Sequence, residues 1–231
     1  MKVLFVTLCL LATIPIGALT QSNSPQNPVE ISGEPRHHPK YENEFVRIWD
    51  VTVPAGDATL WHAHRNDNVV VVFGDANLRI ETLGRDPVEA QWKYGEVRFS
   101  KATYVHRAMN VGTTSFHNLT IELLKSPTPR FLKDAEMPSM PGREIVLDND
   151  RVRAYHITIA PGSSFEMHTH FLPRLSIALT AGELEVRTAG KDKPDKLNVP
   201  VADARWRAGA VTHSIKNVGK KTFEGIDIEF K

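Results

Sequence analysis

Two pairs of histidines, each pair separated by one residue, are the residues best suited to chemistry in this sequence. His62 and His64 lie in the segment LWHAHRNDN, and His168 and His170 lie in EMHTHFLPR. Alternate side chains of a β-strand point to the same side, so each pair would present two imidazole rings on one face. A neutral imidazole offers one lone pair to a metal ion at about 2.0–2.1 Å. Each pair therefore predicts part of a metal site.

A third histidine follows in each half of the chain, within the pattern HxxxN. His106 precedes Asn110, and His213 precedes Asn217 in the same way. If these strands lie beside the histidine pairs, three imidazoles converge on one ion and leave other coordination positions open for water or a substrate. A single histidine pair is often a packed or surface feature, but here the whole set occurs twice at matching positions. We therefore predict two three-histidine metal sites, of which the second (His168, His170 and His213) is the weaker.

The remaining histidines have no such partners in the sequence. His37 and His38 lie in a polar N-terminal segment, whereas His117 and His156 lie in strand-like segments. We predict that these four residues are solvated or structural.

Short β-like segments make up most of the chain and would have to position the histidines. Runs such as FVRIWDVTV, NVVVVF and VRAYHITI are rich in β-branched and aromatic residues, and turn sequences such as PAG, APG and NVG separate them. No long segment holds a helical period. The pattern predicts an all-β sandwich or barrel with at most a turn or two of helix.

The sequence also contains an internal repeat. Residues 43–64 align without a gap with residues 149–170, and residues 106–116 align with residues 213–223. The segment between the two halves is rich in proline and is typical of an interdomain linker. Two copies of one β domain are therefore predicted. The predicted boundaries are a signal peptide at 1–20, an N-terminal tether at 21–42, a first domain at 43–124, a linker at 125–142 and a second domain at 143–231.

The composition and the first residues bear on partners and localisation. The 231 residues carry a net charge of +1, which gives no global signal for nucleic-acid binding. Met1 and Lys2 precede an apolar stretch that Pro15 interrupts, a pattern typical of a secretory signal peptide, with an uncleaved anchor as the alternative. We expect cleavage near Thr20, a secreted or periplasmic protein, and no stable membrane span in the mature form. The only cysteine, Cys9, lies in this stretch, so the mature chain would contain no disulfide.

These motifs resemble those of the cupin family. The first cupin motif begins with glycine, continues with HXH and a glutamate, and ends with a second glycine; the second motif ends in histidine and asparagine. The matching residues in the two halves are Gly56, His62, His64, Gly74, His106 and Asn110, and Gly162, His168, His170, Gly182, His213 and Asn217. The resemblance implies a bicupin, an all-β protein of two tandem jelly-roll (double-stranded β-helix) barrels, each able to bind a divalent metal.

Both halves depart from the family at the position of its glutamate ligand, where this chain has Asn68 and Arg174. Strand alternation turns the neighbouring Asp67 away from the histidines. Asn68 could supply a weak carbonyl ligand or a hydrogen bond to bound water, and without a carboxylate the metal would favour anionic chelating substrates such as an enolate, a thiolate or a carboxylate. Arg174 has three interpretations. It holds a substrate carboxylate or phosphate, it marks a barrel that has lost strong metal binding, or it points to solvent.

The resemblance implies several functions, and histidine spacing establishes none of them. Three-histidine iron sites occur among cupin-type diketone and thiol dioxygenases, whereas the oxalate-degrading bicupins use the glutamate in their manganese sites. We therefore predict a small-molecule oxidoreductase of dioxygenase type, with Asn68 and Arg174 as substrate-binding residues and no assigned catalytic residue. The alternatives are a non-enzymatic protein that binds a small anion or carbohydrate, and a metal-dependent isomerase or lyase. The cofactor would be a divalent transition metal (Fe, Mn, Zn, Ni, Cu or Co), and the protein a monomer or homo-oligomer.

Overall fold

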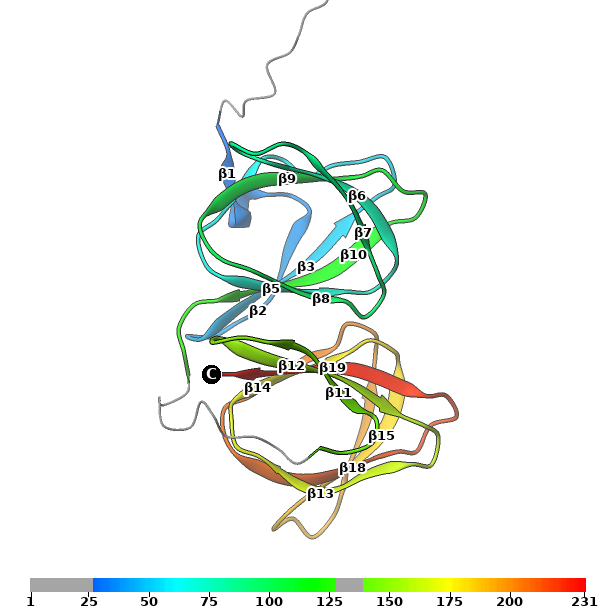
Figure 1. Ribbon diagram of the computed structural model, residues 1–231. Coiled ribbons are helices and arrows are strands. Elements are labelled where there is room, and N and C mark those ends of the chain that lie inside the picture. Colours follow the sequence, from blue (N-terminus) through cyan, green and yellow to red (C-terminus); the bar gives the residue numbers. More distant parts are fainter. Residues whose placement is uncertain (1–26, 128–138) are drawn as a thin grey trace, which may run out of the picture.

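Two β-barrels stacked one on the other form this protein (Figure 1), as the computed structural model shows for residues 27–127 and 139–231. Apart from the short 3-10 helix η1 (Ile31–Gly33), every described element is a strand, which confirms the predicted all-β fold. Within the described residues no helix is long and apolar enough to cross a membrane. The predicted signal peptide and most of the predicted linker lie outside the described residues.

The first barrel consists of two five-stranded sheets. One sheet has the order β1-β4-β9-β6-β7 and the other β2-β3-β10-β5-β8. The strands are β1 (Val29–Glu30), β2 (His37–Glu42), β3 (Val46–Val53), β4 (His62–His64), β5 (Asn68–Val72), β6 (Ala76–Thr82), β7 (Val88–Trp92), β8 (Val97–Ser100), β9 (Tyr104–Asn110) and β10 (Phe116–Leu123).

The second barrel repeats this arrangement, and within residues 139–231 it has no counterpart of β1. Its sheets have the orders β11-β12-β19-β14-β17 and β13-β18-β15-β16. The strands are β11 (Arg143–Asp148), β12 (Val152–Ile159), β13 (Ser164–His170), β14 (Arg174–Ala178), β15 (Gly182–Thr188), β16 (Asp195–Val199), β17 (Ala204–Arg207), β18 (Val211–Asn217) and β19 (Phe223–Phe230). The sequence repeat is therefore a structural repeat, with β2 to β10 corresponding in order to β11 to β19.

A hydrophobic core shared by the two barrels holds them together. Val69 and Val71 of β5 point into this core, as do Leu175 and Ile177 of β14. The alternate residues of the same strands point into the barrels, because successive side chains of a strand face opposite sides. Each of these strands thus packs against the other barrel with one face and lines its own barrel with the other.

Polar and aromatic contacts surround this shared core. The Arg151 guanidinium of the second barrel forms a 2.6 Å ion pair with Asp67 of the first, and the Phe45 and Trp206 rings stack with centroids 5.8 Å apart. Asp67 therefore turns away from the histidines, as strand alternation predicted, and contacts the other barrel. The two halves of the chain associate through sheet faces.

The N-terminal segment differs from the predicted tether, since residues 29–42 belong to the first barrel. β1 pairs in parallel with β4, and after η1 the chain crosses to the other sheet, where β2 pairs with β3. Pro39 and a run of polar residues hid β2 in the sequence. An edge strand tolerates proline because its outer N–H groups need no partner in the sheet.

We expect Leu175→Ala to lower the free energy of unfolding by about 2–5 kcal/mol, because Leu175 is fully buried in the shared core and its loss leaves a cavity. Chemical denaturation followed by circular dichroism measures the change. The matched control is Leu83→Ala, which truncates a leucine that is 52% exposed in a turn. Equal effects of the two substitutions would contradict the role assigned to the shared core.

Candidate metal centre

Three imidazole nitrogens meet inside the first barrel. β4 pairs antiparallel with β9 so that His62 lies directly opposite His106, and alternation along β4 places His64 on the same face. The Nε2 atoms of the three residues form a triangle with sides of 3.1, 3.1 and 3.1 Å. The structure therefore brings together the three residues that the sequence predicted for this site.

This triangle has the dimensions of a metal site. With metal–nitrogen distances of about 2.0–2.1 Å, such a spacing gives N–metal–N angles of about 100°. Three ligands at that angle occupy one side of an ion and leave the other side open. The donor set suits a divalent transition metal, since neutral imidazole is an accepted ligand across that series.

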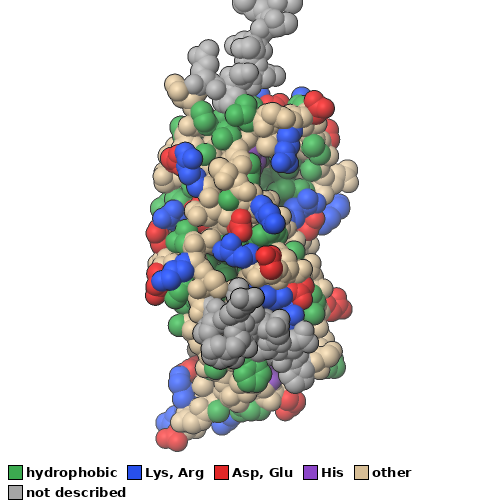
Figure 2. All heavy atoms as spheres, turned by 60° about the vertical axis from the view of Figure 1, so that its left-hand side comes forward, with side chains coloured by type: hydrophobic (Ala, Val, Ile, Leu, Met, Phe, Trp, Pro, Cys, Tyr) green, Lys and Arg blue, Asp and Glu red, His purple; other side chains and the backbone are tan. Residues whose placement is uncertain are grey.

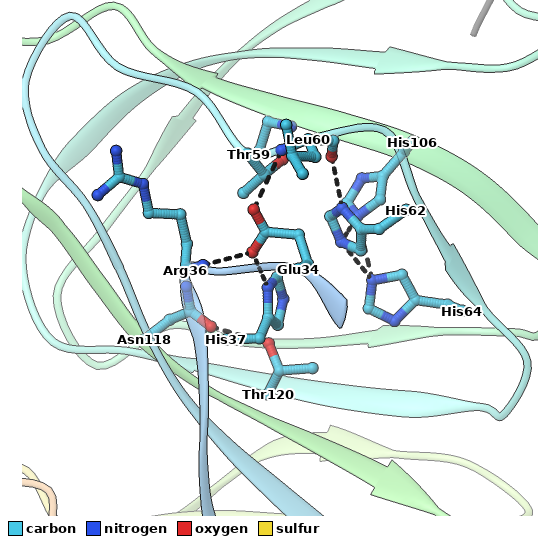
Figure 3. A network of polar contacts seen from close by, with 11 residues as sticks. Glu34, Arg36, His37, Thr59, Leu60, His62, His64, His106, Asn118 and Thr120 are labelled. Atoms are coloured by element: carbon cyan, nitrogen blue, oxygen red, sulfur yellow. Dashed lines mark hydrogen bonds and ion pairs between the residues drawn. The ribbon is translucent and has the colours of Figure 1, made fainter. Parts of the chain in front are cut away.

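Contacts behind the rings fix their orientation. The Nδ1–H of His62 donates to the carbonyl oxygen of Leu60 at 2.8 Å, which leaves the Nε2 lone pair facing the triangle. The His64 ring stacks on Tyr104 with centroids 4.7 Å apart and an interplanar angle of 14°. Figure 3 shows the three rings side by side with their nitrogens directed toward one another.

The surroundings keep these imidazoles neutral, which is the form that binds a metal. Burial first, and then the neighbouring His37, lower the pKa of His62 to about 4. Burial, with His62 and His37, lowers the pKa of His64 to about 2. The pKa of His106 lies well below its ordinary value for the same reasons, loss of water first and then the other histidines.

Asn68 lies where the sequence predicted, on the inner face of β5. Its amide nitrogen donates to the Tyr104 hydroxyl at 3.0 Å, and its Oδ1 is buried without a hydrogen-bond partner among the described residues. A buried acceptor of this kind calls for a donor from outside the protein. Asn68 is therefore placed to receive a hydrogen bond from a ligand or water in the cavity.

The asparagines of the HxxxN patterns have a structural role. The Asn110 side chain donates to the carbonyl oxygens of Val53 and Thr114 and accepts from the N–H of Gly112. Asn217 makes the equivalent bonds in the second barrel. Both side chains hold a turn closed, so they position β9 and β18.

A cavity of about 500 Å³ opens from the histidine triangle. Val70, Trp92 and Phe99 give it apolar walls, and Arg98, whose guanidinium forms a 2.6 Å ion pair with Glu96, also lines it. The Arg98 guanidinium lies 4.8 Å from the centre of the Trp92 ring, and its buried Nε has no hydrogen-bond partner among the described residues. Sequence reasoning missed Arg98, because no short motif marks a single cation on a strand.

His37 is buried, so the prediction that it is solvated is wrong. His37 is 7% exposed and lines the cavity, and one of its ring nitrogens lies within 4.8 Å of ligand nitrogens of His62 and His64. Its Nδ1–H donates to the Glu34 carboxylate at 2.6 Å. His38, the next residue on β2, is exposed, as predicted.

The second barrel assembles its own histidines in the same way. His168 lies opposite His213 in the β13–β18 pair, and the Nε2 atoms of His168 and His170 are 3.2 Å apart. The ligand nitrogens of all three lie within 4.8 Å of one another. His168 Nδ1–H donates to the carbonyl oxygen of Glu166 at 2.7 Å, which repeats the contact between His62 and Leu60.

Two buried arginines distinguish this second site. Arg174 is 3% exposed and lines a cavity of about 350 Å³, so the interpretation that it points to solvent is wrong. The side chain of Arg143 is 4% exposed and lines the same cavity. Burial, followed by the charge of Arg174, lowers the pKa of His213 to about 3. The same charge opposes a metal ion at this place.

Comparison with known proteins identifies the fold. No protein-family sequence model and no curated protein sequence matches the chain. Among solved structures, AerE from Microcystis aeruginosa is 12% identical, with a TM-score of 0.58 over 86% of this chain and 98% of that one. The oxalate decarboxylase of Lactobacillus farciminis in a formate complex is 12% identical, with a TM-score of 0.62 over 87% and 85% of the two chains. A mutant of Bacillus subtilis oxalate decarboxylase OxdC gives 11% identity and a TM-score of 0.61 over 87% and 76%.

These similarities confirm the predicted cupin fold with two domains. At such low identity the fold alone is shared. Together with the geometry above, they show a chain with the two-domain cupin fold and a three-histidine group in each barrel.

We expect the metal-free protein to lose stability as the pH falls from 7 to 4. An unfolded histidine has a pKa of about 6.5, whereas the folded-state pKa values of His62 and His64 are lowered to about 4 and about 2. Below pH 6.5 the unfolded chain therefore binds more protons than the folded chain, so the free energy of unfolding becomes smaller as the pH is lowered. Urea unfolding at a series of pH values measures this dependence. His64→Leu should make it shallower, and an unchanged slope would contradict the assignment.

Proposed function

We propose that this chain is an exported metal-binding bicupin whose first barrel is the centre of a small-molecule oxidoreductase of dioxygenase type. The observation that carries the proposal is the triangle of Nε2 atoms on the wall of a cavity of about 500 Å³. Cavities of this size hold small organic ligands. The signal-peptide pattern of residues 1–20 supports export.

The protein groups around the triangle are suited to bind an anionic chelating substrate such as an enolate, a thiolate or a carboxylate. A bound redox-active divalent metal would supply the electron transfer that lets an organic molecule react with O2. Arg98 would orient the anion through its Nε–H, which has no acceptor among the described residues, and the Asn68 Oδ1 would accept a hydrogen bond from the substrate or from water. The apolar walls would limit the entry of water.

The test is oxygen consumption by protein loaded with Fe(II), in the presence of a β-diketone, a flavonol or a thiol. We expect at least one of these substrate classes to support turnover. His62→Ala removes a predicted ligand and should lower both iron content and oxygen consumption, the latter by more than about 100-fold. His38→Ala, which removes an exposed histidine outside the site, is the control. Iron content that is unchanged in His62→Ala would refute the assignment of the site.

Small-anion binding without catalysis is a second candidate function, and the second barrel favours it. Buried atoms of two guanidinium groups, Arg174 Nε and Nη1 and Arg143 Nε, have no hydrogen-bond partner among the described residues. Asp227 and Glu229 balance part of the charge, but these N–H groups still have no hydrogen-bond acceptor among the described residues. A carboxylate or phosphate would accept hydrogen bonds from them, because a guanidinium binds either group through paired N–H donors.

Arg174→Met tests this second function, since it keeps much of the volume and removes the charge. Isothermal titration with small dicarboxylates and inorganic phosphate should show binding that weakens by about 10–100-fold in this variant, as the loss of charged hydrogen bonds requires. Arg187→Met, which changes an exposed arginine of β15 in the same barrel, should bind like the unmodified protein. Equal affinities in all three proteins would rule out Arg174 as the anion anchor.

A further inference from the structure

A buried pair of residues, Glu34 and His37, lies beside the first histidine triangle and belongs to no cupin motif of the sequence. Glu34 is 2% exposed, and its side chain accepts hydrogen bonds from His37 Nδ1 at 2.6 Å, the Arg36 N–H at 2.8 Å and the Leu60 N–H at 3.1 Å. All three partners are N–H donors, and a carboxylate accepts all of them through its two oxygens. Glu34 is therefore a buried acceptor whose hydrogen bonds are satisfied, and it holds the His37 ring in place.

The contact between Glu34 and His37 fixes which nitrogen of the imidazole is free. Because Nδ1 carries the proton that binds the carboxylate, the lone pair of the neutral ring lies on Nε2. The His37 ring centroid is 4.7 Å from that of His62 and 6.3 Å from that of His64. Figure 3 shows the His37 ring next to Glu34, with the three histidines of the triangle beside them. Histidines that bind metals are commonly backed by a carboxylate on the other ring nitrogen in this way.

The second barrel shows that this position faces the site in both halves. His37 pairs with Val51 on β3, and Arg143 pairs with Ile157 on β12, which is the residue that aligns with Val51 in the repeat. The same place in the barrel therefore holds a lone-pair donor in the first half and a cation in the second. Asn68 and Arg174 repeat that contrast at the place of the family's glutamate.

We infer that His37 is a fourth nitrogen ligand of the metal in the first barrel, and that Glu34 supplies through it the negative charge that the family's glutamate supplies directly. This rests on the proposed metal site of His62, His64 and His106. The segment from β1 to β2 makes the arrangement, since it pairs with β4 in one sheet and with β3 in the other. The backbone of Leu60 contacts both residues: its N–H donates to Glu34, and its carbonyl oxygen accepts from His62.

The test uses the full chain with His168→Ala and His213→Ala, which removes the second triangle. This background is loaded with Zn(II), its affinity is measured by competition with a chelator, and the bound imidazoles are counted by X-ray absorption. We expect four imidazoles, falling to three in His37→Ala with an affinity lower by about 10–100-fold. Glu34→Gln should keep four imidazoles and weaken binding. His38→Ala, on the same strand but exposed, should change neither quantity.

His37→Phe serves if His37→Ala does not fold, because it keeps a ring against His62 and removes the nitrogen. The same imidazole count with and without His37 would overturn the inference and leave the three-histidine site standing, even if the affinity fell. If the background binds no Zn(II), the proposed metal site fails and the inference fails with it. A background that binds Zn(II), loses it on His62→Ala and loses one imidazole on His37→Ala or His37→Phe supports both.

Discussion

Three imidazole Nε2 atoms that meet at 3.1 Å inside a barrel are the constraint on which the site of the first domain depends. Neutral imidazoles placed this close repel one another through their lone pairs unless a proton or a cation lies between them. Burial works against the proton, because it lowers the pKa values of all three rings. The barrel therefore holds an arrangement that a metal ion would relieve. The bond from His62 to Leu60 and the stacking of His64 on Tyr104 keep the rings in place.

The shared core between the barrels sets a limit on how the two sites can differ. β5 and β14 each present one face to that core and the other to a cavity, so the residues facing the core are fixed by packing. The residues facing the cavities are free to diverge. The chain uses this freedom at Asn68 and Arg174, and again at His37 and Arg143, while it keeps the three histidines in both halves. The two barrels thus share one scaffold, whereas the charge of each site differs.

The charges give the two barrels different ligand preferences. In the first barrel the lone-pair donors His37 and Asn68 line the cavity, and the Glu34 carboxylate accepts a hydrogen bond from His37. In the second barrel two buried guanidinium groups line the cavity, and their charge adds to the cost of binding a cation there. Both barrels mix basic and acidic side chains on the face that Figure 2 shows, so this contrast lies inside the molecule and not on that surface.

The sequence by itself determined the parts that local pattern encodes. Period-two alternation indicated strands and placed His62 with His64, and the repeat indicated two domains with matching triads. The direction of Asp67 and the inward position of Asn68 also followed from alternation. Only the tertiary structure decided the roles of Glu34, His37 and Arg143. They reach the sites because the chain crosses between sheets and because distant strands pair, and those are contacts that no local period records. Pro39 and the polar residues around it concealed β2 because an edge strand does not need the hydrophobic pattern of a central one.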